Sequence, residues 1–137
     1  MAGLDPAAVT SSAFGYDEAQ LRFHEGNAWT HLGDTGSAWT AHERALQLYP
    51  ASDYLDRSMI MLDRAACLAR DGDTGGAAHH LVTTLSGLTP EQRSGLLLAR
   101  ASEVYHGVPA PLRGTTPVRE VGELLALCAT QEKESVR

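Results

Sequence analysis

The tetrapeptide Gly-Asp-Thr-Gly occurs twice in the chain, starting at Gly33 and again at Gly72, so the sequence repeats with a period of 39 residues. A period of roughly 20 to 50 residues is typical of stacked units, none of which can bury its apolar face without its neighbours. The two glycines suit the left-handed residue that ends a helix, and Asp34 and Asp73 suit the cap that begins the next helix. Each copy therefore predicts a tight helix–turn–helix.

Apolar residues on both sides of these turns recur at the spacing of amphipathic helices. Between the turns, residues 55–69 carry apolar positions on two faces, which predicts that this central helix is the most buried. The sets that come after the first and second turns are Ala38, Ala41, Ala45, Leu48 and Tyr49, and then Ala77, Ala78, Leu81, Val82, Leu85 and Leu88.

Two further start signals predict the last pair of helices. Thr89, Pro90 and Gln92 combine a capping hydroxyl, a proline in the first turn and an amide three residues after the cap. This combination predicts a helix from about Pro90 to His106. A stretch with two prolines and two glycines then predicts a loop, before a final helix that starts near Thr116.

With a first helix from about Asp17 to Leu32, the sequence predicts an all-α fold of about six helices in three antiparallel hairpins. At 137 residues the chain has the length of one domain. We expect the helical domain to cover residues 17–130, with a loosely ordered N-terminal extension over 1–16 and a flexible tail over 131–137.

Composition excludes several classes of protein. Lys and Arg number 11 against 17 Asp and Glu, so the net charge is −6, and we expect no direct nucleic-acid binding because that needs clustered positive charge. Cys67 and Cys128 lie far apart in the sequence and fit a reducing compartment. The longest apolar run, Leu124 to Ala129, is too short to cross a membrane. We therefore expect a cytoplasmic protein without a membrane partner.

The repeats resemble tetratricopeptide repeats (TPRs), which carry small residues at helix crossings and a terminal proline. Thr84 departs from the pattern, and the period exceeds the usual length of about 34 residues, so the resemblance implies a longer connection around residues 51–56. The matching positions are Gly26 through Trp29, Gly33-Asp34, Ala38, Ala45, Leu46, Leu48 and Pro50, and then Ala65, Leu68, Gly72-Asp73, Ala77 and Leu81.

A longer likeness, over roughly residues 4–126, is to the C-terminal region of actinobacterial XRE-type helix-turn-helix transcriptional regulators. Such regulators carry an N-terminal DNA-binding domain, which this chain does not supply. The resemblance implies a sensor or interaction module, either as a fragment of a regulator or as a stand-alone homologue. The runs that carry it are Phe14-Gly15-Tyr16 and residues 19–25, 45–50, 62–68 and 92–95.

In a TPR array, the first helix of each hairpin lines a concave groove. The resemblance implies a groove that contacts a protein, a peptide or a small-molecule effector. An alternative is that Phe23, Met59 and Leu62 pack against the next helix. The implied groove residues are Gln20, Phe23, Asn27, Thr30 and His31, then Met59, Leu62, Ala66, Ala69 and Arg70, then Gly95, Leu98, Ser102 and Tyr105.

Three charged residues precede the small residues at the helix crossings: Glu25, Arg64 and Arg100. Equivalent positions on stacked helices are neighbours, so we predict an ion ladder in which Glu25 pairs with Arg64. In this ladder Arg64 shares a carboxylate, Asp63 or Glu103, with Arg100. Anchoring of a ligand's phosphate or carboxylate by the two arginines is an alternative.

Metal and nucleophilic chemistry find little support in the sequence. None of the six histidines forms a His-x-x-x-His pair, so we expect no metal and no cofactor. Adjacent residues of a helix do not face each other, so His24-Glu25 and His42-Glu43 predict solvated or half-buried side chains and no catalytic pair. Cys67 is predicted to be a packed core thiol.

The sequence thus favours a non-enzymatic module that binds a protein, a peptide or an effector, as part of a transcriptional regulator. The alternative is a stand-alone small-molecule-binding protein or biosynthetic enzyme with a polar pocket of Glu25, Arg64 and Arg100. A structural scaffold is a third interpretation. A homodimer that buries the groove or an end of the array is compatible with each of them.

Overall fold

The computed structural model describes the backbone of residues 6–136 and the side chains of residues 18–131. Within this part the chain forms six α-helices and no strand, which confirms the predicted all-α fold. The elements are α1 (Pro6–Leu32), α2 (Thr35–Leu48), α3 (Tyr54–Arg70), α4 (Thr74–Ser86), α5 (Gly95–Gly107), a 3-10 helix η1 (Ala110–Gly114) and α6 (Thr116–Val136).

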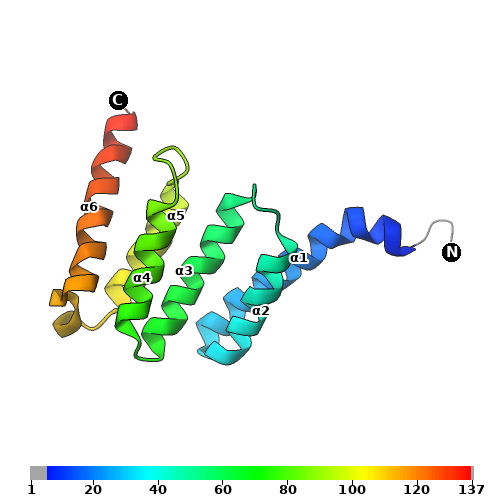
Figure 1. The fold of residues 1–137 in the computed structure, drawn as a ribbon, viewed down its shortest axis with the longest axis horizontal. Helices are drawn as coiled ribbons and strands as arrows, with labels where there is room; N and C mark the ends of the chain where they lie inside the picture. Colours follow the sequence, from blue (N-terminus) through cyan, green and yellow to red (C-terminus); the bar gives the residue numbers. More distant parts are fainter. Residues whose placement is uncertain (1–5, 137) are drawn as a thin grey trace.

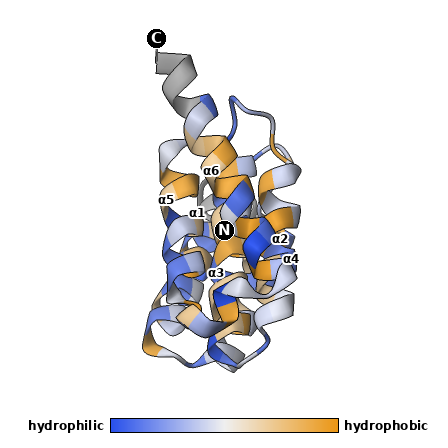
Figure 2. Ribbon diagram, turned by 90° about the vertical axis from the view of Figure 1, so that its left-hand side faces the viewer, coloured by the Kyte–Doolittle hydropathy of each residue, from blue (hydrophilic) through white to orange (hydrophobic). Residues whose placement is uncertain are grey.

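The helices form three consecutive hairpins, α1/α2, α3/α4 and α5/α6, which succeed one another in a row (Figure 1). Helix α3 contacts α1 on one side and α5 on the other, so these three helices make one layer. Viewed along the row, α1 and α5 lie on one side and α2 and α4 on the other (Figure 2). Helix α6 packs on α4 and α5 at the end of the row.

The two predicted turns are present and have the same geometry. Gly33 and Gly72 have φ values of +83° and +91°, in the left-handed region that glycine adopts without strain. After each glycine an aspartate caps the next helix: the Asp34 carboxylate accepts the backbone N–H of Ser37, and Asp73 accepts that of Gly76. The sequence repeat therefore corresponds to two copies of one local structure.

The apolar core has two parts, and α3 contributes to both. The smaller cluster, at the α1/α2 end, contains Ala19, Ala45, Tyr49 and Ile60. The larger cluster joins α3 to α6 and contains Leu62, Ala65, Ala78, Leu81, Leu85, Leu88, Leu97, Leu98, Ala101, Val104, Val108, Val118, Val121 and Cys128. Because α3 supplies buried residues on both sides, it is the central helix that its two-sided apolar pattern predicts.

The predicted start of the fifth helix was wrong by about one turn. Thr89 and Gln92 do form the reciprocal bonds of a capping box, with the N–H of each donated to the other's side chain. The chain leaves the helical path after that turn, and residues 93 and 94 are not helical. The Arg93 side chain reaches back to the previous hairpin, where its Nε donates to the carbonyl of Leu85 at 2.9 Å. Helix α5 begins after Ser94, whose Oγ accepts the N–H of its first turn.

The outer helices extend beyond their predicted bounds. Helix α1 begins at Pro6, before the predicted start at Asp17, and α6 continues to Val136. The loose order expected for residues 1–16 and 131–137 stays a prediction, and residues 1–5 and 137 lie outside the described part. No helix within residues 6–136 combines the length and the apolar character that crossing a membrane requires.

Candidate binding face

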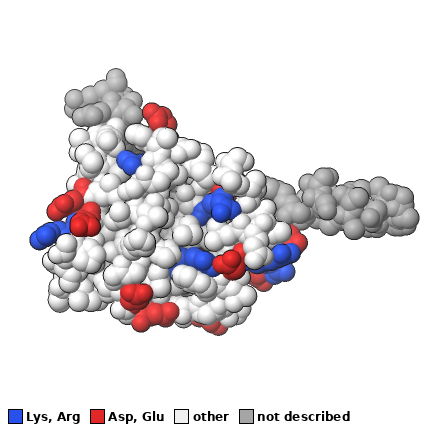
Figure 3. Space-filling view, viewed as in Figure 1, with Lys and Arg blue, Asp and Glu red and all other residues white. Residues whose placement is uncertain are grey.

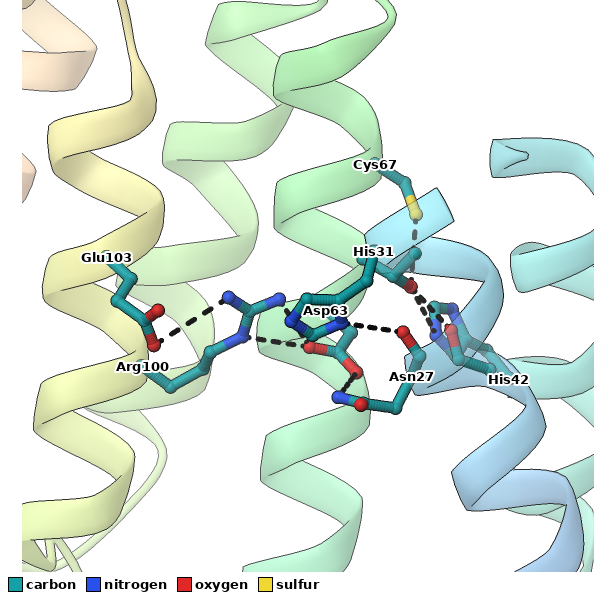
Figure 4. A network of polar contacts seen from close by, with 9 residues as sticks. Asn27, His31, His42, Asp63, Cys67, Arg100 and Glu103 are labelled. Atoms are coloured by element: carbon teal, nitrogen blue, oxygen red, sulfur yellow. Dashed lines mark hydrogen bonds and ion pairs between the residues drawn. The ribbon is translucent and has the colours of Figure 1, made fainter. Parts of the chain in front are cut away.

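A buried carboxylate, Asp63, joins the three helices of the first layer. Its side chain is 3% exposed and faces both α1 and α5. Asn27 Nδ2 of α1 donates to Oδ2 at 3.2 Å, while Arg100 of α5 donates to Oδ1 from Nε at 2.9 Å and from Nη2 at 2.7 Å (Figure 4). A buried charge is tolerated when it is paired and hydrogen-bonded, and Asp63 meets both conditions.

Arg100 extends this network from the interior to the surface. Its side chain is 13% exposed and its Nη1 lies 3.8 Å from Oε1 of Glu103, which is 68% exposed. The short bonds to Asp63 fix the guanidinium, and the longer contact leaves Glu103 able to turn toward solvent or a ligand. The network therefore runs from the buried Asp63–Arg100 pair to one exposed carboxylate, that of Glu103.

Small residues of α3 open a hollow of about 260 Å³ beside this network, between α3 and α5. Ala66 and Ala69 leave the space, and Arg70 lies at the rim. The Arg70 guanidinium packs so closely against Gly33 that a Cβ at that glycine would lie 2.6 Å from it. The residues that line the hollow are Ala66, Ala69, Arg70, Arg100, Glu103, Val104 and Gly107.

Helix α1 supplies the third side of this surface. His31 is exposed, and its Nδ1 lies 2.8 Å from the carbonyl of Asn27, so the ring is held beside the Asp63 network (Figure 4). We call this surface the α1–α3–α5 face and define it by Asn27, His31, Arg70, Arg100 and Glu103, together with the alanines of the hollow.

Part of the groove implied by the TPR resemblance lies on this face. Thr30 and Leu62 do not, because both are buried, at 6% and 0% exposure. Their helical phase turns them toward the neighbouring helices, so no partner can reach them in the folded chain. The implied groove residues that do lie on the face are Asn27, His31, Ala66, Ala69 and Arg70.

Other implied groove residues face neighbouring elements. Phe23 packs edge-on against Tyr49, with ring centroids 6.3 Å apart. The Tyr105 hydroxyl lies against Gly122 of α6, where a Cβ would be 2.6 Å from it, so this side chain belongs to the α5/α6 contact. Met59 packs on the larger core cluster and Gln20 is half-buried.

The predicted pairing of Glu25 with Arg64 was wrong. Glu25 accepts from Arg22 at 2.9 Å, and Arg64 pairs with Glu43 of α2 at 3.2 Å. The Arg64 guanidinium also lies 4.1 Å from the centroid of the Trp39 ring. A step of one residue turns a helix by about 100°, so Arg64 points to α2 while its neighbour faces the first layer.

The second part of the predicted ion ladder, in which Arg64 and Arg100 share a carboxylate, is correct for Arg100 and wrong for Arg64. Arg100 contacts both carboxylates that were considered, Asp63 and Glu103. Arg64 does not share them, since its guanidinium bonds to Glu43 and to the carbonyl of Trp39. Glu25, Arg64 and Arg100 therefore lie in three different environments and do not form one polar pocket.

A second polar cluster is closed off from solvent between α1, α2 and α3. Thr30 Oγ1 donates to the carbonyl of Gly26 at 2.6 Å and lies 3.4 Å from His42 Nε2 and 3.7 Å from Cys67 Sγ (Figure 4). Because the Thr30 proton is engaged, His42 donates from Nε2, and its Nδ1 has no hydrogen-bond partner among the described side chains.

The chemistry of this cluster is that of a core. Burial lowers the pKa of His42 to about 4; the Asp63 carboxylate opposes this shift, and the Arg64 charge adds to it by a smaller amount. Burial also raises the pKa of the Cys67 thiol. A neutral imidazole beside a protonated thiol, without access to solvent, is not placed to attack a substrate. Cys67 is the packed core thiol that the sequence predicts.

Two residues of these clusters were missed or misjudged from the sequence. His42 was expected to be solvated or half-buried and is fully buried. It lies four residues after Ala38 and three before Ala45, which places it on the buried face of its helix. Asp63 was predicted only as a possible partner of an arginine. It lies seven residues, or about two helical turns, before Arg70, so this spacing indicates that it is on the same side of α3 as that implied groove residue.

The described side chains, residues 18–131, contain no group of three or more His, Cys, Asp or Glu arranged to hold a metal ion. Compared with known proteins, the chain has no significant match to a family model, to a curated protein or to a solved structure. A functional interpretation of this chain therefore rests on its fold and its side-chain geometry.

Proposed function

We propose that this chain is a non-catalytic, TPR-like module that binds a protein segment, a peptide or an effector on its α1–α3–α5 face. We further propose that it acts as the sensor or interaction region of a transcriptional regulator. One observation carries the binding proposal: polar side chains from three successive first-layer helices converge beside a hollow, on a framework fixed by a buried ion pair.

The chemistry of the face favours an extended partner with both polar and apolar groups. The hollow of 260 Å³ admits a small apolar side chain, which would contact Ala66 and Ala69. Around it, Arg70 offers hydrogen-bond donors, Glu103 offers acceptors, and His31 offers a ring nitrogen. A partner that lies across α1, α3 and α5 can use all of these groups together.

The alternative of an enzyme or a closed polar pocket built on Glu25, Arg64 and Arg100 finds less support. Glu25 lines an open hollow between α1 and α2, Arg64 is buried against α2, and Arg100 lines the separate hollow between α3 and α5. Groups that face three different regions cannot act on one substrate atom.

The binding proposal can be tested with peptides selected from a random display library on the wild-type protein. We expect Arg70→Glu and Glu103→Lys to weaken the selected peptides at least about tenfold, which corresponds to about 1.4 kcal/mol. Arg119→Glu is the matched control, because this exposed arginine lies on α6, away from the face. Equal affinity for all variants in a titration by fluorescence anisotropy would place binding elsewhere and contradict the proposal.

A further inference from the structure

The outer side of α1 carries exposed apolar residues that no other element of the described chain covers. Leu21, Trp29 and Leu32 are 54%, 37% and 73% exposed, and they are three of the seven large apolar side chains that are exposed among residues 18–131. Leu21 and Leu32 are eleven residues apart, close to three full turns, so they share one side of the helix. Buried Ala19 and Thr30 lie on the opposite side.

Next to this stripe, α1 and α2 enclose an open hollow of about 490 Å³. Its lining includes Trp29, which is 37% exposed, together with Ala41 and the hydroxyl-bearing residues Ser37 and Thr40 of α2. We call the stripe and the hollow together the α1–α2 end face. The residues that line the hollow are Arg22, Glu25, Trp29, Ser37, Thr40, Ala41 and Arg44.

The charges in and beside the α1–α2 end face balance one another once Glu18, which lies outside the lining of the hollow and pairs with Arg44, is counted. Arg22 pairs with Glu25 at 2.9 Å and approaches Glu18 at 4.0 Å, and Arg44 pairs with Glu18 at 3.1 Å. Two arginines thus meet two glutamates, whereas the whole chain has a net charge of −6. Blue and red groups lie side by side at this end of the molecule (Figure 3).

From these features we infer that the α1–α2 end face is a contact surface for a second copy of this chain. Two acidic molecules repel each other least where each is locally neutral. A two-fold contact places the same patch on both sides, so the paired arginines and glutamates of one copy face those of the other without a net charge on either side. With the two α1 helices antiparallel, Leu21 of one copy lies beside Leu32 of the other, and both leucines leave water.

This contact uses a different side of α1 from the α1–α3–α5 face. It therefore leaves the proposed binding surface open in both copies and does not depend on the proposed function. A dimer of this kind would present two binding faces, and a partner with two recognition segments would gain from binding both.

Sedimentation equilibrium of the full chain at about 100 µM tests the inference. We expect a weight-average mass of about 1.8 times the chain mass of 14.6 kDa, because a dissociation constant of about 10 µM, the strength we expect of this contact, pairs about four-fifths of the chains at that concentration. Leu32→Glu should shift the equilibrium at least tenfold toward the monomer. Leu96→Glu is the matched control, since Leu96 is 58% exposed on α5 and lies outside the end face.

Far-ultraviolet circular dichroism establishes that each variant remains folded. A second variant of the same face, Leu21→Glu, tests whether the loss of the dimer with Leu32→Glu is due to the face and not to that one position. A wild-type protein that is monomeric at 100 µM overturns the inference. A dimer that survives both Leu21→Glu and Leu32→Glu also overturns it. A dimer that is lost in Leu127→Glu and unaffected by Leu32→Glu would place the contact on α6 and would equally refute it.

Discussion

Among the side chains of residues 18–131, His42 is one whose surroundings strongly oppose its charged form. The ring is fully buried against Gly26, where an added Cβ would lie 2.4 Å from His42 Cδ2. The glycine therefore leaves space for the imidazole, and the imidazole fills the crossing between α1 and α2. A proton on this ring would add a charge in the core, and the cost of burying that charge outweighs the attraction of the Asp63 carboxylate.

The depressed pKa of His42 predicts a pH dependence of stability with a definite sign. The folded chain binds this proton near pH 4 and the unfolded chain near pH 6.5, so the unfolded state binds more protons between these values. We expect the free energy of unfolding to rise by up to about 3 kcal/mol from pH 4 to pH 6.5 through this group, and to level off above. Urea titrations across this range measure it.

The comparison that isolates this effect uses two histidine variants. His42→Gln should lose the part of the pH dependence that belongs to the ring, whatever its effect on overall stability. His79→Gln removes an exposed histidine and should keep the wild-type slope. Parallel curves for the wild type and His42→Gln would show that the buried ring does not control the acid stability.

At the scale of the helices, the Asp63–Arg100 pair connects α3 with α5 and lies at the centre of the α1–α3–α5 face. The geometry is tight, with two nitrogens of one guanidinium on one carboxylate oxygen. A buried pair of this kind fixes the relative position of two helices more than it adds net stability, because desolvation offsets much of the attraction. Losing one partner is costly because the other stays buried and unpaired.

A double-mutant cycle separates these two effects. We expect Arg100→Met to lower the free energy of unfolding by about 3–5 kcal/mol, since Asp63 is then left without its cation. In the double variant Asp63→Leu/Arg100→Met at least half of that loss should be recovered. Glu103→Ala, which removes an exposed carboxylate, should cost no more than about 0.5 kcal/mol. Additive single effects in chemical denaturation would show that the two side chains do not interact.

Across the full row of hairpins, the two core clusters predict unequal stability. Alanine dominates the buried apolar residues of α1 and α2, whereas leucine and valine dominate the cluster that joins α3 to α6. A buried leucine removes more apolar surface from water than an alanine does. In a row of units that contact mainly their neighbours, the weaker end opens first.

Native-state hydrogen exchange measures this difference. We expect the amides of α1 and α2 to exchange through openings of lower free energy than those of α3 and α4. The measurement belongs at a protein concentration low enough to keep the chain monomeric, because pairing through the α1–α2 end face would protect α1. Equal protection of all six helices would show that the molecule opens as a single cooperative unit.

The class of the fold, the number of helices and the two Gly-Asp turns could be predicted from the sequence alone, because they depend on signals within a few residues of each other. Glycine at a positive φ and an aspartate cap act locally, so Gly33 and Asp34 can be interpreted without knowing what they pack against. A local signal can also give a wrong prediction. The capping box at Thr89 is present, but it is followed by a single turn, and the helix begins only at Gly95.

Which polar side chains meet depends on the packing of the helices. Asp63 and Arg64 are adjacent in sequence, yet they face different helices because one residue turns a helix by about 100°. Their partners, Arg100 and Glu43, depend on how neighbouring helices are staggered, and that stagger is set by the packing of the whole row. The Arg64–Glu43 pair could not be predicted for this reason, because it depends on distances between helices, which no short stretch of sequence contains. The α1–α3–α5 face was predicted in part, through Asn27, His31 and Arg70. The burial of His42 follows from its helical phase, whereas its contact with Thr30 depends on how α1 and α2 pack.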